Sequence, residues 1–262
     1  MFEYSQNEFE ESYASIIKSL SLEHVYQKNH CVIFLGGQPG SGKSSFINQD
    51  DFFIRYVKIN GDDYRKFHPH FEEIVHEYKA DMAAITQSFI NDCVERLINE
   101  LSEQGYNLII EGTLRNPDTT IGTCELLKNK GYTTDLYVMA TDALVSWEST
   151  INRAKLAESL DEVPRYVPIE KFNYIVNNLE SNVKKIEDAG CFDGISVVNR
   201  DNELLYSSRN DLHNDAASIV AMELQLGTWK KYYADNYINK LSENENQQVL
   251  VSREGNVRRK GR

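Results

Sequence analysis

The sequence lacks paired cysteines and long apolar runs. Four cysteines, Cys31, Cys93, Cys124 and Cys191, stand far apart without a C-x-x-C pair, which predicts buried thiols in a reducing compartment. No apolar stretch reaches membrane length and the amino terminus is acidic, so we expect neither a signal peptide nor a transmembrane helix. Both observations favour a cytoplasmic protein.

An excess of positive charge is also missing. The chain carries 28 Lys and Arg against 40 Asp and Glu, a net charge of -12. A duplex-binding protein needs a basic face, and an acidic surface is repelled by anionic lipid, so we expect neither nucleic acid nor a membrane as partner. An anionic substrate would then be held by a few local cations in a cleft.

The length and composition are those of a globular enzyme. With 262 residues, 41% hydrophobic and 26% charged, the chain suffices for one large α/β domain or two small ones. We find no internal repeat and no clear domain boundary. The sequence predicts one domain over residues 1–240, with an amino-terminal helix near 5–26, and a disordered polar tail over 241–262 that ends in basic residues.

One glycine-rich stretch fits the phosphate-binding P-loop pattern G-x-x-x-x-G-K-[ST]. It lies between an apolar run over 31–35 and a helical segment, and consists of Gly37, Gln38, Pro39, Gly40, Ser41, Gly42, Lys43 and Ser44. The glycines let backbone N–H groups point at a phosphate, and the following helix directs its positive end at the same anion. Lys43 is expected to reach the β- and γ-phosphates and Ser44 to ligate Mg²⁺. A chance glycine-rich turn would not need the flanking strand and helix.

Acidic residues follow two other predicted strands. Asp62 comes just after the strand over 56–60, and Glu111 comes just after the strand over 107–110. In open α/β sheets the carboxyl ends of the strands bind the ligand. Strands and helices alternate along the chain, which predicts an α/β fold of the P-loop NTPase or kinase-like type, with a mostly parallel sheet flanked by helices.

Helical periodicity predicts the longer helices and a lid. We expect one helix over 80–103 and another over 215–241, and we expect a helical lid insert near 142–190. Arg153 on the lid's first helix and Arg165 on its Pro-rich loop would approach the site together. Each arginine alone could equally be a surface charge. His68 and His70 could suggest a metal pair, but no third ligand is near, and a solvated or capping role is favoured.

The P-loop leaves two reaction types open, hydrolysis and phosphoryl transfer. Transfer needs a group that takes or orients the acceptor proton, and cations on the developing charge. Asp62 could accept the proton, and Arg153 and Arg165 could stabilise the phosphoryl group. Asp62 and Glu111 compete for the Mg²⁺-linked acidic role, which spacing alone does not assign. No guanine-specificity motif of GTPases is present.

Several motifs in order resemble the zeta-toxin family of bacterial toxin–antitoxin systems. The resemblance covers nearly the whole chain except the tail. The P-loop alone is unspecific, whereas the ordered set is specific. Its motifs are the P-loop from Leu35, the segment 59–65 with His68 to His70, the segment 105–115, the segments 127–132 and 137–141, and Asn199-Arg200.

The resemblance implies an ATP-dependent kinase that phosphorylates the 3′-hydroxyl of the amino sugar of UDP-N-acetylglucosamine and so blocks early cell-wall synthesis. It implies that Lys43 binds the ATP phosphates, that Asp62 is the general base, and that Arg153 and Arg165 stabilise the phosphate. On the substrate side it implies Glu95, Glu111 and Thr113, with Arg115 in the same motif. The family's toxins are neutralised by an antitoxin whose helix obstructs the nucleotide site, so a protein antitoxin is the expected partner.

Two alternatives remain open from the sequence. The chain could be a P-loop kinase for another small hydroxylated acceptor, such as an antibiotic or a different nucleotide sugar. It could also be a regulatory module that moves on ATP binding and transfers nothing. The second alternative predicts that Asp62→Asn leaves function intact, whereas both kinase hypotheses predict loss of turnover with ATP binding kept.

Overall fold

The computed structural model describes residues 2–20, 30–48, 51–79, 81–211 and 213–238. They divide into two compact units, one ending at Leu224 and one beginning at Gln225. Among the helices described, none combines the length and apolar character that a transmembrane span requires. The expected boundary between 1–240 and 241–262 stays a prediction, because residues 239–262 lie outside the described part.

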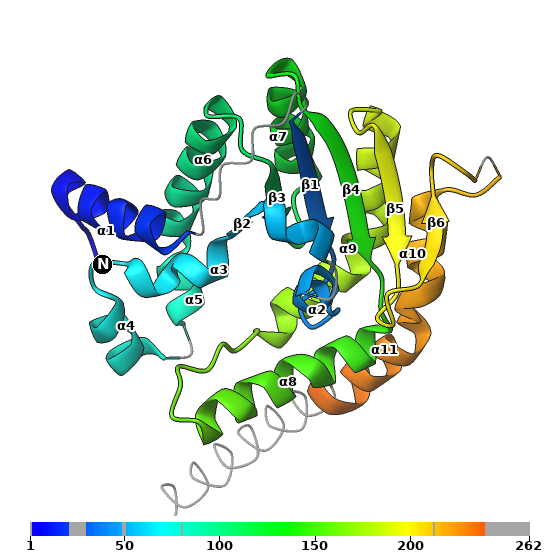
Figure 1. The fold of residues 1–262 in the computed structure, drawn as a ribbon. Helices are drawn as coiled ribbons and strands as arrows, with labels where there is room; N and C mark the ends of the chain where they lie inside the picture. The colour runs from blue at the N-terminus through cyan, green and yellow to red at the C-terminus, as the bar shows by residue number, and fades with distance from the viewer. Residues whose placement is uncertain (1, 21–29, 49–50, 80, 212, 239–262) are drawn as a thin grey trace, which may run out of the picture. The chain divides into compact units, whose positions relative to one another are not determined.

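A mostly parallel sheet forms the centre of the first unit (Figure 1), as predicted. Its order is β2-β3-β1-β4-β5-β6, and only the pairing of β5 with β6 is antiparallel among the described strands. The strands are β1 (Cys31–Gly36), β2 (Val57–Asn60), β3 (Leu108–Glu111), β4 (Thr133–Met139), β5 (Gly194–Val198) and β6 (Leu204–Ser207).

The register of β2, β3 and β1 aligns the groups that the sequence singles out. Asn60 pairs with Glu111, and Glu111 pairs with Leu35, in neighbouring parallel ladders. The residues that follow β2, β3 and β1 therefore leave the sheet from one edge. This edge brings the P-loop, Asp62 and Glu111 together, as expected for the carboxyl ends of parallel strands.

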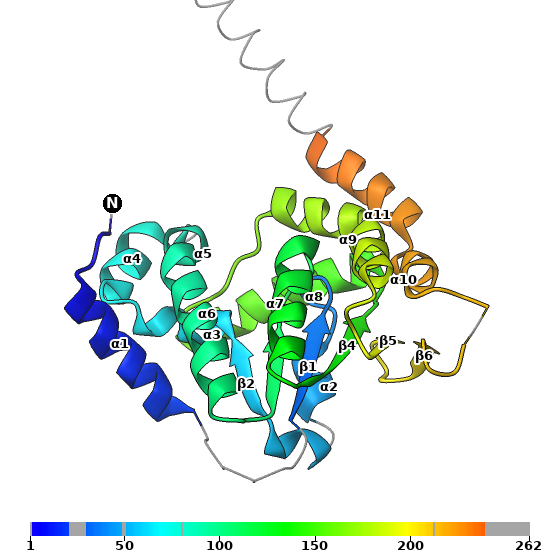
Figure 2. The same cartoon turned by 90° about the horizontal axis from the view of Figure 1, so that it is seen from above.

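Helices cover both faces of the sheet. Helix α2 (Lys43–Asn48) lies on one face, and α6 (Gln87–Glu103), α7 (Pro117–Asn129) and α9 (Ile169–Ala189) lie on the other (Figure 2). Beneath α2 and the 3₁₀ segment Asp51–Arg55, alternate strand residues form one core cluster, because successive side chains of a strand point to opposite faces. Its buried members are Ile33, Leu35, Ile47, Phe53, Ile109, Met139 and Val198.

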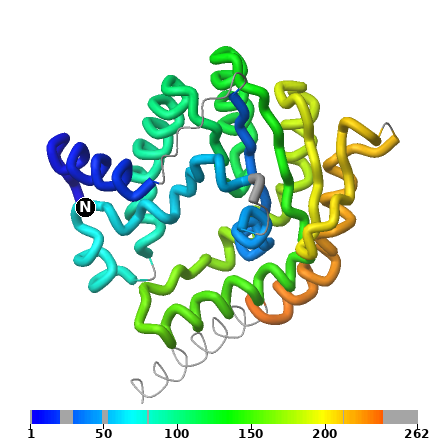
Figure 3. Tube along the Cα trace, in the orientation of Figure 1, coloured from blue at the N-terminus to red at the C-terminus, as the bar shows by residue number. Residues whose placement is uncertain are grey.

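Between β2 and β3 the chain leaves the sheet as a helical excursion (Figure 3). It comprises α3 (Gly61–Tyr64), the 3₁₀ turn Arg65–Phe67, α4 (Phe71–Tyr78), α5 (Met82–Ile85) and α6. The expectation of one helix over 80–103 is wrong, since Thr86 separates α5 from α6. Thr86 is fully buried and its hydroxyl donates to Met82 O at 2.8 Å, a side-chain bond that competes with regular helix geometry.

The amino-terminal helix α1 (Gln6–Ser19) packs on this excursion. Tyr13 donates to Glu100 of α6 at 2.8 Å, and Phe9 contacts Phe89 edge to face. The capping role expected for His68 is confirmed, since it caps the 3₁₀ turn and its Nδ1 accepts from the backbone N–H of His70, but the solvated role is wrong. Its ring is only 4% exposed and lies against Tyr4, His70 and Phe89. Within the described residues no group of three or more His, Cys, Asp or Glu side chains could hold a metal ion.

Helix α8 (Ala143–Ser159) runs past the carboxyl ends of β1 and β4 (Figure 1), and a loop over 160–168 joins it to α9. The end of α8 lies near the helical excursion, where Glu158 is 3.8 Å from Lys79, and the loop reaches the excursion through Arg165, which pairs with Asp62 at 2.8 Å (Figure 3). A loop thus stands where the sequence predicts one, and Pro168 is the N-cap of α9; the role of this loop as a lid stays a prediction. Helix α10 (Ala216–Leu224) completes the unit beside β5 and α9.

The second unit begins with a backbone break. The expectation of one helix over 215–241 is wrong, because Gln225 adopts φ +48° between α10 and α11 (Leu226–Tyr233). A residue in this left-handed region cannot continue a right-handed helix. A short π-helix follows over Ala234–Ile238. The aromatic side chains of Trp229, Tyr233 and Tyr237 stack along this unit, as their four-residue spacing predicts.

Candidate active site

The P-loop has the tight conformation that its glycines predict. Gly37, Gly40 and Gly42 have φ values of +140°, +77° and +103°, a region that disfavours side chains. At Gly40 there is also no room, since a Cβ atom would lie 2.1 Å from the carbonyl oxygen of Ser146 on α8. Close packing of the loop on α8 therefore requires glycine here.

Two buried hydrogen-bond sets fix the loop from β4 and α8. Gln38 is fully buried and its Nε2 donates to Thr141 O at 2.5 Å and to Ser146 Oγ at 3.0 Å. The Thr141 hydroxyl donates in turn to Ser41 O at 2.9 Å. From the turn between β5 and β6, Arg200 Nη1 donates to Gly40 O at 2.8 Å. The backbone between Gly37 and Ser44 is thus held in place without a ligand, which lowers the ordering cost of binding one.

Lys43 lies inside the loop with its ammonium group on backbone oxygens. Nζ donates to Gly37 O at 2.8 Å and to Gln38 O at 2.9 Å. Burial lowers the pKa of Lys43 to about 8, a shift that Glu111 and Asp62 oppose and that Arg165 and Arg153 reinforce. These four groups are therefore close enough to act on the lysine electrostatically. The anionic phosphate that a P-loop binds would favour the charged form.

A cavity of about 270 Å³ opens beside the P-loop helix, with Ser44, Asn60, Asp63 and Glu111 among the residues that line it. Burial raises the pKa of Glu111, Lys43 opposes this shift, and Asp63 adds to it. The Ser44 hydroxyl and the Glu111 carboxylate are oxygen donors that fit Mg²⁺, which takes few protein ligands and completes its shell with phosphates and water. Ser44 would hold the ion, with nucleotide phosphates and water completing its shell.

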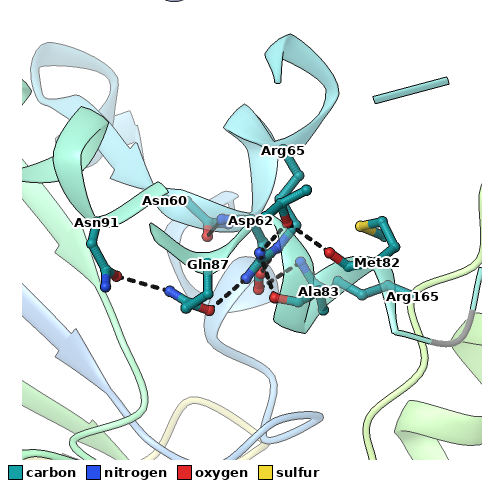
Figure 4. A network of polar contacts seen from close by, with 9 residues as sticks. Asn60, Asp62, Arg65, Met82, Ala83, Gln87, Asn91 and Arg165 are labelled. Atoms are coloured by element: carbon teal, nitrogen blue, oxygen red, sulfur yellow. Dashed lines mark hydrogen bonds and ion pairs between the residues drawn. The ribbon is translucent and has the colours of Figure 1, made fainter. Parts of the chain in front are cut away.

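Asp62 lies between two arginines in the close view of Figure 4. Arg65 Nε donates to Asp62 Oδ1, and Arg165 Nη1 pairs with Asp62 Oδ2, both at 2.8 Å. Burial by itself would raise the pKa of Asp62, but Arg165 and Arg65 outweigh it and hold the pKa below its usual value. The carboxylate is therefore ionised at neutral pH and able to accept a proton or a hydrogen bond.

The two lid arginines differ in their contacts. Arg165, on the loop after α8, spans the gap to Asp62 on the excursion after β2. Arg153, on α8, makes no hydrogen bond or ion pair within the described part of the chain, although it acts on Lys43. Both predicted arginines thus lie near enough to act on Lys43 of the P-loop. From the sequence, each alone could equally have been a surface charge.

The predicted substrate residues are only partly brought together. Thr113 and Arg115 flank Leu114, which is buried with φ +53° and lies against the end of β1. Asn182 of α9 holds this turn by donating to the carbonyl oxygens of Leu114 and Arg115 at 3.0 and 3.2 Å. Glu95 is exposed on α6, and no hydrogen bond or ion pair joins it to the site among the described residues.

Sequence reasoning missed two cationic groups at the site, Arg65 and Lys171. Arg65 stands three residues after Asp62, a spacing that brings both to one side of a helical turn. Lys171, in the first turn of α9, is half-buried and acts electrostatically on Asp62. The i, i+3 spacing could have revealed Arg65, whereas nothing in the sequence near Lys171 points to a site 109 positions upstream.

This arrangement defines a class of protein. A parallel sheet in the order given above, a P-loop after its central strand β1, and an acid with lid arginines at the same edge characterise a P-loop α/β protein of kinase-like fold. The chain belongs to the zeta toxin family, whose model matches residues 18–211. The resemblance stated from the motifs is therefore confirmed.

Known relatives agree with the family assignment. The chain is 36% identical over 232 residues to toxin PezT of Streptococcus pneumoniae serotype 4, covering 87% of this chain and 91% of that protein. It is also 36% identical over 196 residues to toxin zeta of Streptococcus pyogenes, covering 72% of this chain and 68% of that protein.

Solved structures extend the comparison. A chain from the structure of the PezAT chromosomal toxin–antitoxin system of Streptococcus pneumoniae aligns with a TM-score of 0.74 at 33% identity, covering 92% of this chain and 98% of that one. A chain of the AvrRxo1-ORF1:-ORF2 complex aligns with a TM-score of 0.55 at 13% identity, covering 82% and 66%. The second likeness concerns the fold alone.

Proposed function

We propose that this protein is an ATP-dependent kinase that transfers the γ-phosphate of ATP to the 3′-hydroxyl of the amino sugar of UDP-N-acetylglucosamine. The observation that carries the proposal is Asp62, an ionised carboxylate flanked by Arg165 and close enough to Lys43 to act on it. A kinase needs these three functions at one place: a group for the acceptor proton, a phosphate-binding lysine and a cation for the transferred phosphoryl group. Membership of the zeta toxin family supports the substrate.

In this proposal each residue has a defined task. Lys43 and the N–H groups of the P-loop bind the β- and γ-phosphates, and Mg²⁺, when bound near Ser44, neutralises phosphate charge. Asp62 accepts the proton of the acceptor hydroxyl, and Arg153 and Arg165 stabilise charge on the transferred group. Because the transition state is loose, the proton can leave late, so a carboxylate of low pKa suffices as the base.

Release of Arg165 from Asp62 belongs to the same proposal. Arg165 pairs with the carboxylate that has to receive the acceptor. An incoming γ-phosphate carries more negative charge than Asp62 and competes for the guanidinium. Movement of Arg165 from Asp62 to phosphate would both free the base and deliver the cation, so that nucleotide binding prepares the acceptor site.

The acceptor side would be formed by Glu111, Thr113 and Arg115, with Glu95 approaching from α6. Glu111 lines the cavity beside the P-loop, and Thr113 and Arg115 follow it on a turn that is fixed by Asn182. The diphosphate of a nucleotide sugar suits the cations of this side, Arg115 and Lys171, whose charges act on one another.

The biological role proposed is that of the toxin of a toxin–antitoxin system, which inhibits cell-wall synthesis in the cytoplasm and is neutralised by a protein antitoxin. Similarity to toxin PezT over most of both chains supports this role. Expression of the wild-type chain alone in a bacterial host should arrest growth with a loss of cell-wall integrity. Normal growth at equal expression would contradict the toxin role.

The proposed kinase activity is tested by comparing the turnover of wild type with that of Asp62→Asn. Purified protein is incubated with Mg-ATP and UDP-N-acetylglucosamine, and the sugar nucleotide is followed by mass for one added phosphate. Removal of the base should lower turnover by about 10²–10⁴-fold. ATP binding, measured by calorimetry, should be kept and should not weaken, because Arg165 no longer has to leave a charged carboxylate to reach the phosphate.

A matched control for this test is Asp188→Asn, a surface carboxylate paired with Lys184, which should behave as wild type. Transfer to other hydroxylated acceptors but not to this sugar would replace the substrate and keep the reaction. ATP binding without transfer to any acceptor, equal in wild type and Asp62→Asn, would favour the regulatory alternative.

A further inference from the structure

The guanidinium of Arg65 lies behind Asp62 and has no task in the mechanism above. Arg65 is 6% exposed, and its guanidinium donates four hydrogen bonds. Nε donates to Asp62 Oδ1 at 2.8 Å and Nη2 donates to Gln87 Oε1 at 3.1 Å. Nη1 donates to Ala83 O at 2.9 Å and to Thr86 Oγ1 at 2.7 Å. A buried cation with this many acceptors has little freedom to move.

The acceptors of Arg65 come from the break between α5 and α6 (Figure 4). Ala83 belongs to α5, Gln87 begins α6, and the Thr86 hydroxyl that accepts from Arg65 also donates to Met82 O. Gln87 is held in turn, since its Nε2 donates to Asn91 Oδ1 at 2.9 Å. A continuous chain of hydrogen bonds therefore runs from α6 through Arg65 to the carboxylate of Asp62.

The other oxygen of Asp62 has a different kind of partner. Arg165 pairs with Oδ2 from the loop after α8, and its side chain is 31% exposed, against 7% for that of Arg65. A buried arginine on packed helices therefore holds one oxygen, and a half-exposed arginine on a loop holds the other. Loop side chains exchange partners more readily than buried ones, so Oδ2 is the oxygen that a substrate can reach.

We propose that Arg65 is a positioning residue, which fixes Asp62 through Oδ1 so that Oδ2 is presented to the acceptor hydroxyl once Arg165 has moved. Two of the acceptors of this guanidinium, Ala83 O and the Thr86 hydroxyl, lie at the break between α5 and α6. The proposal rests on the proposed function, in which Asp62 accepts the proton of the acceptor. The competing explanation is that Arg65 only stabilises the fold.

The first experiment compares Arg65→Lys with wild type. Lysine keeps the charge and can reach one acceptor, but it lacks the planar fork that joins Asp62 to α5 and α6. We expect kcat to fall by about 10–100-fold, the range for a catalytic group displaced by a fraction of an ångström to 1 Å. KM and affinity for ATP should stay within about twofold, because Arg65 makes no contact with the P-loop.

A matched control is Arg96→Lys. Arg96 is also held by two carboxylates, Glu10 and Glu100, and its guanidinium lies over the ring of Tyr13, but it joins α6 to α1 and lies outside the proposed site. It should lower the unfolding temperature and leave kcat per folded molecule unchanged. Equal kcat for folded Arg65→Lys and wild type would overturn the positioning role.

A second pair of variants covers the case in which Arg65→Lys fails to fold. Gln87→Ala removes one anchor while leaving the Arg65–Asp62 pair, and should lower kcat by about threefold or more. Gln87→Glu restores an acceptor for Arg65 and should restore most of the activity. A Gln87→Ala enzyme as active as wild type would count against the proposal, since the anchoring chain would then be dispensable for turnover.

The crystal structure of Arg65→Lys, or of Gln87→Ala, decides the proposal independently of turnover. We expect the Asp62 carboxylate to rotate or to occupy more than one conformer, whereas an unchanged Asp62 would overturn the proposal. If wild type transfers no phosphate to the nucleotide sugar, the proposed function fails on that observation, and the position of Asp62 in the variant still decides the role of Arg65.

Discussion

Lys43 is a cation that the fold buries among oxygens of its own loop. Its ammonium group is surrounded by loop oxygens and is 8% exposed. Because burial disfavours the charged form, the pKa of Lys43 falls to about 8, and the neighbouring arginines act in the same direction. Above about pH 8, binding of a phosphate would therefore restore the charge of Lys43, which would couple nucleotide binding to proton uptake.

The prediction at this scale is that ATP binding weakens as the pH rises above about 8. Above that pH the free protein loses the proton from Lys43 and must regain it to bind phosphate, so the affinity falls by up to about tenfold per pH unit. Below pH 8 the lysine is already charged and the affinity no longer depends on it. Calorimetry between pH 7.5 and 9.5, in buffers of different ionisation heat, should show rising Kd and increasing proton uptake.

Lys43→Gln is the control for this prediction. Glutamine is neutral at every pH in the range, so ATP should bind weakly to this variant and without the rise in Kd. A wild-type affinity that is equal at pH 7.5 and 9.5 would contradict the account of Lys43 as a lysine with a lowered pKa.

At the scale of elements, the turn after β3 depends on the last residue of β1. Leu114 is buried and adopts φ +53°, in the left-handed region. For a residue other than glycine this conformation costs free energy, and it persists only when the surrounding structure holds it. Gly36 leaves the space that the Leu114 side chain fills, and Asn182 of α9 bonds the turn from the other side. Thr113 and Arg115 owe their positions to this contact between two strands and a helix.

Gly36→Ala should therefore disturb this turn. A Cβ atom on Gly36 would lie 2.3 Å from Leu114 Cδ1 and 2.4 Å from its Cγ, so Leu114 must move. Overpacking of this kind lowers the free energy of unfolding by about 1–3 kcal/mol, and the displaced Thr113 and Arg115 should raise KM for the sugar nucleotide several-fold. Urea denaturation and steady-state kinetics measure the two effects.

Gly112→Ala provides the matched control, one residue after β3, because a Cβ atom there meets nothing within 4 Å. It should change the free energy of unfolding by less than about 0.5 kcal/mol. Leu114→Ala combined with Gly36→Ala should recover part of the lost stability. Equal stability of Gly36→Ala and Gly112→Ala would refute the proposed contact.

At the scale of the first unit, His68 joins the amino-terminal segment to the helical excursion. Its ring contacts Tyr4 and Phe89, and its Nδ1 accepts from the backbone N–H of His70 at 3.1 Å. Burial, and then the nearby His70, lower the pKa of His68 to about 4. The folded state thus requires a neutral imidazole, while the unfolded chain takes up a proton near pH 6.5.

The sign of the resulting pH dependence follows from these pKa values. Between about pH 6.5 and 4 the unfolded state binds the proton and the folded state does not, so stability falls as the pH falls through this window. The 2.5-unit difference corresponds to at most about 3 kcal/mol when the window has been crossed. Urea unfolding at pH 7, 5.5 and 4.5 should record a progressive loss.

His68→Gln separates this effect from general acid unfolding. Glutamine keeps an acceptor for the His70 N–H but does not titrate, so the variant should be less stable at pH 7 and lose less stability toward pH 4.5. If wild type and variant lose the same free energy over this range, His68 is not the group responsible.

Much of the fold follows from local pattern. Alternating apolar runs and amphipathic helices sufficed for the parallel sheet, because buried strands and half-buried helices carry periodicities of their own. The pattern failed at Thr86 and Gln225, where helices end without glycine or proline. In the first case the reason is tertiary, since Thr86 bonds to an arginine 21 positions earlier; nothing in the sequence explains the left-handed Gln225.

The residues of the candidate site also fall into two groups, those that the sequence predicts and those that only the tertiary structure explains. Sequence by itself determined the P-loop, with Lys43 and Ser44 in it, since phosphate binding there depends on a contiguous backbone turn whose glycines can be read directly. It also placed Asp62 and Glu111 at strand ends. Tertiary structure alone decided three features: the pairing of Asp62 with Arg165, the burial of Arg65, and the contact of Gly36 with Leu114. Each of them joins residues on separate elements or fixes a side chain by packing, and a local sequence pattern contains no information on either.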